Sequence, residues 1–262
     1  MPASPDVLLP VPVGMITSFL FVVARVGGVV AFVPIPGFRT ASAIPKVVLT
    51  ITLAIALLPS WPVVRDPSAV PALSLWWLPA EIAFGVAIGA FVGWLIESLV
   101  MAMQFLSLQA GYSYAAMIDP ATQADSGVLQ VIAQLFASVL FFVIGVDREL
   151  LRLFGASLEV LPPGAWRLHP EMAMELIRWS GMMLVLALRI ALPLIALLTL
   201  IDVALALMGR LQPQLQLLSL AFPLKMLTSI ALIVVLVGSF GALFQSAAGT
   251  LIKTLWRVTA LR

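Results

Sequence analysis

Residues 79–108 read PAEIAFGVAIGAFVGWLIESLVMAMQFLSL, a stretch with the length and polarity of a membrane helix. Its charged side chains are Glu81 and Glu97, and it contains no basic residue. A bilayer core about 30 Å thick is crossed by about 20 predominantly apolar helical residues. The stretch is therefore long enough to cross a membrane. Pro79 suits its first turn, where a backbone N–H has no helical partner.

The composition of the whole chain also indicates a membrane protein. Of its 262 residues, 62% are hydrophobic and 10% are charged, whereas an ordinary soluble domain is about 25% charged. The net charge is +2 and no run of Lys or Arg occurs, which argues against nucleic-acid binding. We predict an all-α membrane protein, with residues 1–262 forming a single polytopic membrane domain. Its predicted hydrophobic helices are 13–33, 44–58, 79–108, 127–146, 178–208 and 215–240, followed by an amphipathic tail at 241–262.

Cysteine is absent from the sequence and histidine is nearly so, which limits the catalytic and metal sites that the chain can form. The chain has no Cys, and its single histidine is His169. A thiolate or histidine-rich metal site is therefore excluded. Gly111 and Ser113 superficially match an intramembrane serine protease, but that chemistry needs a base next to the serine, and no predicted helix contains a histidine. We predict that the chain is not an enzyme and binds neither a metal nor a cofactor.

Several charged residues lie inside the predicted apolar helices, where each costs about 2.5–3.5 kcal/mol on insertion scales. Two interpretations are open: ion pairing between helices, or a polar seam or ion relay at a subunit contact. Arg189 and Asp202 lie 13 positions apart, roughly 20 Å along one helix, so they cannot pair directly. Glu81 lies near a segment end, where it can face the lipid headgroups. The deeper charges are Arg25, Glu97, Arg189, Asp202 and Lys225.

Gly85, Gly89 and Gly93 recur every four residues and therefore share one face of the predicted helix at 79–108. Small residues at this spacing let two membrane helices approach closely. The sequence does not say whether the neighbouring helix belongs to this chain, to a second copy or to another protein.

The segment at 111–126 is neither a short turn nor a soluble domain. It combines small residues with bulky ones and contains the turn-forming pair Asp119-Pro120 near its middle. Non-helical backbone at membrane depth is tolerated only inside protein or beside a water-filled cavity. The segment is thus either an exposed loop or a stopper within a pore. The predicted stopper residues are Gly111, Tyr112, Ser113, Tyr114, Ala115, Ala116, Met117, Ile118, Asp119 and Pro120.

At this segment the sequence resembles the FliR/SctT family of flagellar and type III secretion export-apparatus membrane proteins. The resemblance covers essentially the whole chain, and the run at 123–127 leans towards the flagellar branch. The matching stretches are ARVGG at 24–28, LQAGYSYA at 108–115, IDP at 118–120, QADSGVL at 123–129, ALRIALP at 187–193 and LLSLAFPLK at 217–225.

The resemblance implies a structure and a function that composition alone does not. Members form tilted helical hairpins within a helical hetero-oligomeric export gate, together with FliP and FliQ, while FlhB surrounds the entrance. Unfolded flagellar subunits pass through the gate, which lies in the bacterial inner membrane within the flagellar basal body. The segment at 111–126 then corresponds to the plug, with Tyr114 and Met117 at positions where the family often has Phe. The alternative interpretation is a secondary transporter or channel for a small solute, coupled by Glu97 or Arg189.

Overall fold

The computed structural model describes residues 13–32, 43–60, 77–112, 127–161, 166, 170–211 and 217–260. Every element within these ranges is a helix, which confirms the predicted all-α fold class. The elements are α1 (Val13–Phe32), α2 (Ala43–Ala56), the short 3-10 helix η1 (Leu58–Ser60), α3 (Trp77–Ala110), α5 (Val128–Ile144), α6 (Val146–Val160), α7 (Pro170–Leu211) and α8 (Leu217–Ala260).

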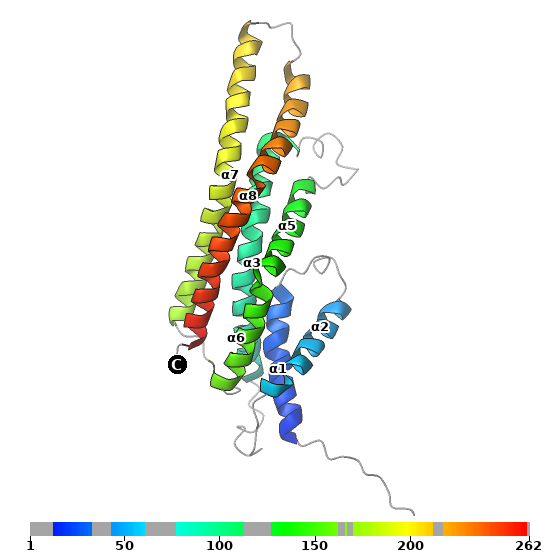
Figure 1. Ribbon diagram of the computed structural model, residues 1–262, viewed down its shortest axis with the longest axis vertical. Helices are drawn as coiled ribbons and strands as arrows, with labels where there is room; N and C mark the ends of the chain where they lie inside the picture. The colour runs from blue at the N-terminus through cyan, green and yellow to red at the C-terminus, as the bar shows by residue number, and fades with distance from the viewer. Residues whose placement is uncertain are drawn as a thin grey trace, which may run out of the picture.

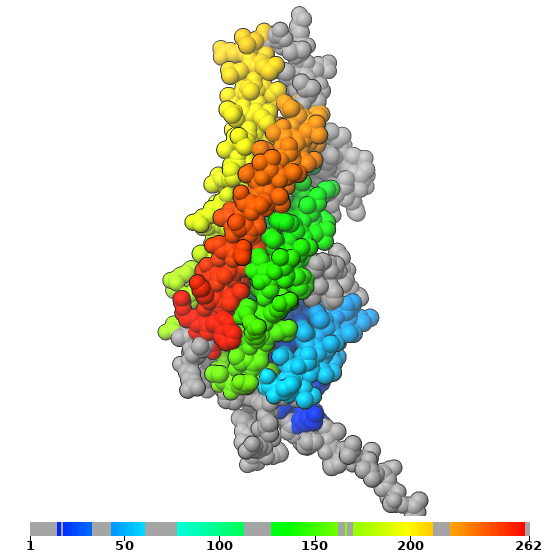
Figure 2. Space-filling model, viewed as in Figure 1, coloured from blue at the N-terminus to red at the C-terminus, as the bar shows by residue number. Residues whose placement is uncertain are grey.

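Helix α3 lies at the centre of the molecule (Figure 1) and packs against α1, α5, α7 and α8. Its buried side chains point in several directions around the helix, because neighbours surround it on most sides. The long helices α7 and α8 form a hairpin that extends beyond the other helices at one end (Figure 1). On the face shown in Figure 2, α8 lies beside α5 and α6, with which it is in contact.

The lengths of the described helices indicate which of the six predicted hydrophobic helices could cross a membrane. By length and composition, three described helices could cross a membrane: α3, α7 and α8. The pair α5 and α6 makes a fourth candidate, bent by 61° at a break near Gly145. Helix α2 has 14 residues and is therefore about 21 Å long, which is too short for a bilayer core.

Three predicted boundaries differ from the structure. The segment at 147–160, which lies between the predicted helices 127–146 and 178–208, belongs to the amphipathic helix α6, because its apolar residues recur at helical spacing between the charges. Helix α7 begins at Pro170 rather than near residue 178, since proline is well suited to a first turn. Helix α8 runs through Gly241 to Ala260, so residues 241–260 are not a separate tail helix. A glycine lowers helix propensity by only about 1 kcal/mol, which the buried contacts of Phe240 and Phe244 offset.

Candidate functional site: an ion-paired core and the anchor of residues 113–126

The glycine face of α3 packs against α1 of the same chain. A Cβ added at Gly85 would collide with the backbone carbonyl of Arg25, and one at Gly89 would lie 2.9 Å from the Cβ of Phe32. A Cβ at Gly93 would lie 3.5 Å from the Phe32 carbonyl oxygen, an ordinary contact. Gly28 completes the contact from α1, where a Cβ would lie 2.6 Å from a carbonyl oxygen of α3. The neighbour that the sequence left open is therefore α1, and its backbone touches that of α3.

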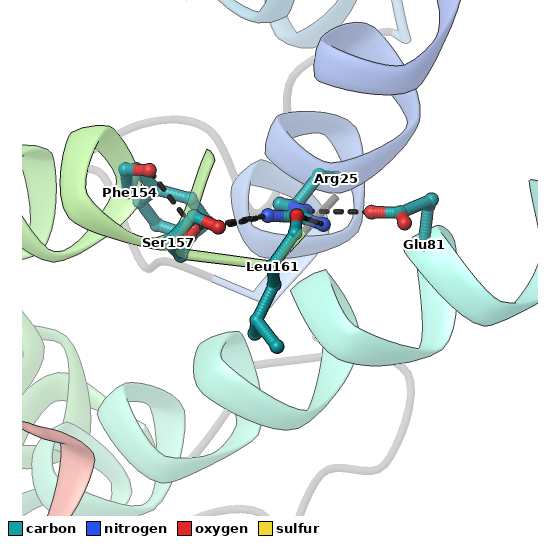
Figure 3. Close-up of polar contacts among 5 residues, drawn as sticks. All are labelled: Arg25, Glu81, Phe154, Ser157 and Leu161. Carbon is teal, nitrogen blue, oxygen red and sulfur yellow. Dashed lines mark hydrogen bonds and ion pairs between the residues drawn. The ribbon is translucent and has the colours of Figure 1, made fainter. Parts of the chain in front are cut away.

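This close approach places Arg25 of α1 opposite Glu81 of α3 (Figure 3). Arg25 Nε donates a hydrogen bond of 2.6 Å to Glu81 Oε2, and the two side chains are 1% and 0% exposed. Nη1 of the same guanidinium donates to the carbonyl and hydroxyl oxygens of Ser157 at 2.9 and 3.2 Å. Nη2 donates to the Leu161 carbonyl at 3.4 Å, and the guanidinium carbon lies 4.9 Å from the centre of the Phe84 ring.

The Arg25 network joins three helices that are far apart in sequence. A buried ion pair adds little net stability, but removing one partner strands a buried charge at a cost of about 3–5 kcal/mol. The carbonyls of Ser157 and Leu161 lie at the C-terminal end of α6, where carbonyl oxygens are open to donors from outside the helix. The Ser157 carbonyl accepts from the N–H of Leu161 as well as from Arg25. Glu81 therefore does not face headgroups, as its position in the segment suggested, but neutralises the fully buried Arg25.

The C-terminal end of α3 is closed by a glycine turn. Gly111 has φ of +86°, and its N–H donates to the Leu108 carbonyl, while the N–H of Tyr112 donates to the Ser107 carbonyl. This pair of hydrogen bonds is the Schellman arrangement, which ends a helix at a left-handed residue. A Cβ at Gly111 would also lie 2.6 Å from the Phe222 ring, so both the backbone conformation and the space require glycine.

Side chains next to this turn attach it to the α7–α8 hairpin. Gln109 Nε2 donates to Asp202 Oδ2 of α7 at 3.1 Å. The Tyr112 hydroxyl lies 3.2 Å from the Met226 carbonyl and 3.3 Å from the Ser229 hydroxyl, both on α8. Residues 113–126 follow directly in the chain. We call the contacts of Gln109 and Tyr112 with the hairpin the loop anchor.

The ion pair between Asp202 and Lys225 holds in place the carboxylate to which Gln109 of the loop anchor donates. Lys225 Nζ lies 2.9 Å from Asp202 Oδ1, which joins α7 to α8. The side chain of Lys225 is 11% exposed and that of Asp202 is 41% exposed. Asp202 thus accepts from both Gln109 and Lys225, and one carboxylate connects α3, α7 and α8.

The remaining predicted residues fall into two groups. Glu97 is partly buried on α3, whereas Arg189 is exposed on α7. Of the predicted stopper, Gly111 forms the turn that ends α3, and Tyr112 belongs to the loop anchor. The others lie outside the described residues: Ser113, Tyr114, Ala115, Ala116, Met117, Ile118, Asp119 and Pro120.

One buried polar atom was not anticipated from the sequence. Oδ1 of Asp147 is buried and has no hydrogen-bond partner within the described part of the chain. The residue lines a cavity of about 420 Å³ between α1, α2 and the α5–α6 pair, whose other walls are almost entirely apolar, among them Val26, Leu53 and Phe154. The sequence carried one signal, since Asp147 follows the helix-ending residue Gly145 and stands in the first turn of α6.

Apolar helices with internally paired charges define the class: this is a polytopic α-helical membrane protein whose core is joined by ion pairs. The chain belongs to the bacterial export proteins, family 1, whose family model matches residues 16–251. This confirms the resemblance inferred from the sequence. Similar proteins include the flagellar biosynthetic protein FliR of Escherichia coli strain K12, 29% identical over 81% of each chain. The protein of that name from Bacillus subtilis strain 168 is 23% identical over 95% of this chain and 97% of its own, and that from Pectobacterium carotovorum is 24% identical over 83% of each.

Proposed function

We propose that this chain is a non-catalytic subunit of the flagellar protein-export gate in the bacterial inner membrane. It builds the pore together with FliP and FliQ, with FlhB at the entrance, and residues 111–126 close that pore. Family membership over residues 16–251 and the names of the similar proteins support the export role. The loop anchor is the observation that carries the closing role, because it fixes the start of the segment on the hairpin.

The loop anchor is suited to a segment that must remain in place. An ordinary surface loop needs no more than a helix cap, which the turn at Gly111 already supplies. Here Tyr112 and Gln109 add hydrogen bonds to two further helices. Each such bond contributes about 0.5–1.5 kcal/mol, so together they hold the first residues of the segment against α7 and α8.

The test replaces residues 113–117 with five glycine and serine residues in cells that carry the rest of the export apparatus. The entry of a small fluorescent dye into resting cells is then measured. We expect dye to enter cells with the altered chain and not cells with the natural one. The matched control replaces residues 64–68, in the segment between α2 and α3, by the same linker.

Three results would count against the proposal. If dye entry stays at the natural level while the altered gate still assembles, residues 113–117 do not close a pore. If the purified chain alone transports a solute in liposomes, the chain is a small-solute transporter. Dye entry that persists in cells lacking FliP and FliQ would show that the leak does not pass through the assembled gate.

A further inference from the structure

We infer that the outer side of α7 around Arg189 binds a membrane helix of a different protein, and that this helix carries an Asp or Glu opposite Arg189. The inference goes beyond the proposed closing role, since it concerns a surface distant in sequence from residues 111–126. It rests on an exposed cation, its apolar surroundings and the proline that follows it.

Arg189 is exposed on an otherwise apolar surface. The buried side of α7, which includes Ala187, Ile190 and Leu194, packs towards the core of the molecule. Exposed apolar residues at positions −7, −4, +3, +11, +14 and +18 from Arg189 lie on its own side of the helix. We call this surface the Arg189 stripe, and it consists of Met182, Val185, Arg189, Leu192, Leu200, Val203 and Leu207.

The chain does not supply a counter-charge for Arg189 among its described residues. Arg25 is paired with Glu81, and Lys225 is paired with Asp202. Arg178, the nearest arginine towards the start of α7, is paired with Glu175 on its own helix. Arg152 is paired with Glu149, so the ion pairs among the described residues serve these four other cations and leave Arg189 on the surface.

Pro193 adds a backbone acceptor at the same place. It lies inside α7, four residues after Arg189, and has no N–H. The Arg189 carbonyl therefore cannot accept its usual helical hydrogen bond from residue 193. The helix thus presents a guanidinium and a carbonyl with spare acceptor capacity within one turn. A partner carboxylate can accept from the guanidinium, whereas the carbonyl is open to a separate donor from the partner.

The depth of Arg189 favours a protein partner over a lipid headgroup. Arg178 and Arg189 are 11 residues apart, about 16 Å along the helix. If Arg178 lies at a headgroup layer, Arg189 lies near the middle of a core about 30 Å thick. Charged residues at that depth face protein or water and pair with other charged groups.

A second copy of this chain is a poor partner for the stripe. In the described helices that could cross a membrane, the carboxylates of Glu81 and Asp202 are already paired within the chain. Glu97, the remaining carboxylate within the apolar core of α3, α7 and α8, is partly buried on α3 and already has an interaction of its own. In the α5–α6 pair, Oδ1 of Asp147 is buried inside this chain. The complement of the stripe is therefore an apolar helix from another chain with one acidic side chain in its middle.

The experiment uses the full chain in cells that make the rest of the export apparatus. A photo-crosslinking benzoyl-phenylalanine replaces Val185 or Leu192, each within one turn of Arg189, and a control places it at Val139 on α5. We expect illumination to join the stripe positions to a peptide of another membrane protein, and that peptide to contain an Asp or Glu. The peptide is identified by mass spectrometry.

Charge exchange then tests the pairing itself. Arg189→Glu should lower recovery of the crosslinked partner in mild detergent by about tenfold, Arg189→Lys should retain most of it, and changing the partner's carboxylate to Lys should restore recovery with Arg189→Glu. Arg178→Gln is the matched control and should leave recovery unchanged. Helix content by circular dichroism must remain natural in every variant.

The inference is overturned if the stripe positions crosslink only to lipid or to a second copy, if the partner peptide contains no carboxylate, or if the charge exchange fails while the helix content is natural. None of these results depends on dye entry through the gate, so this inference and the closing role stand or fall separately.

Discussion

Glu81→Leu should destabilise the protein strongly although it places an apolar residue in an apolar core. The substitution removes the carboxylate that neutralises Arg25, whose side chain is 1% exposed. Breaking a buried pair in this way costs about 3–5 kcal/mol. Arg25 still donates to Ser157 and Leu161, and these hydrogen bonds partly replace the lost partner. We therefore expect a loss near the lower limit, about 3 kcal/mol.

The double variant Arg25→Met with Glu81→Leu separates the ion pair from the packing. It removes both charges and should recover most of the loss, since replacing a buried pair by apolar residues is often neutral or stabilising by about 1–4 kcal/mol. The Leu161 carbonyl then loses the donor from Arg25, and the Ser157 carbonyl keeps only the N–H of Leu161, which keeps the gain small. Arg152→Gln breaks an exposed ion pair with Glu149 and is the control, with an expected effect below about 1 kcal/mol.

The assay is the reversible unfolding of the purified chain in mixed micelles with increasing SDS, followed by far-ultraviolet circular dichroism. The reasoning is wrong if Glu81→Leu lowers the free energy of unfolding by less than about 1 kcal/mol, since a buried charge without a partner costs more than that. It is equally wrong if the double variant is no more stable than Glu81→Leu alone, because the loss would then come from packing rather than charge.

Three further predictions use the same unfolding assay. Gly85→Ala should cost at least about 1–3 kcal/mol because its Cβ meets the Arg25 carbonyl, whereas Gly93→Ala should cost little; equal losses would contradict the close contact of α1 and α3. Tyr112→Phe should cost about 0.5–1.5 kcal/mol through the lost hydroxyl contacts, and an unchanged stability would remove Tyr112 from the loop anchor. Asp147→Leu should stabilise the isolated chain by about 1–3 kcal/mol, because it removes a buried oxygen without a partner; destabilisation would mean that the carboxylate is satisfied in solution.

The predictable part of the fold is the part decided by long apolar runs. Helix α3 was expected at 79–108 and occupies Trp77–Ala110, because a predominantly apolar run of thirty residues leaves no other structure at membrane depth. The segment containing α6 was not recognised as a helix because Arg148 and Arg152 break its apolar run. Its amphipathic spacing was the available signal. The continuation of α8 beyond Gly241 depends on contacts of Phe244 with other helices, which the sequence does not reveal.

The candidate site, too, was predictable from the sequence only in part. The sequence indicated that Arg25, Asp202 and Lys225 needed partners, since isolated charges are costly in an apolar segment. It could not say which residues pair, because the members of a pair lie 23 or 56 positions apart and meet only through tertiary packing. Glu81 was interpreted as facing headgroups from its place near the end of an apolar run. Its burial follows from the glycines of α3, whose lack of side chains brings α1 within contact distance.

The distance in sequence between Arg25 and Glu81 has a consequence for biosynthesis. Arg25 leaves the ribosome 56 residues before its carboxylate and 132 residues before Ser157. Until α3 has been made, Arg25 is a cation without its counter-charge, which costs about 2.5–3.5 kcal/mol in an apolar environment on insertion scales. We therefore expect α1 to reach its final packing only when α3 has been synthesised.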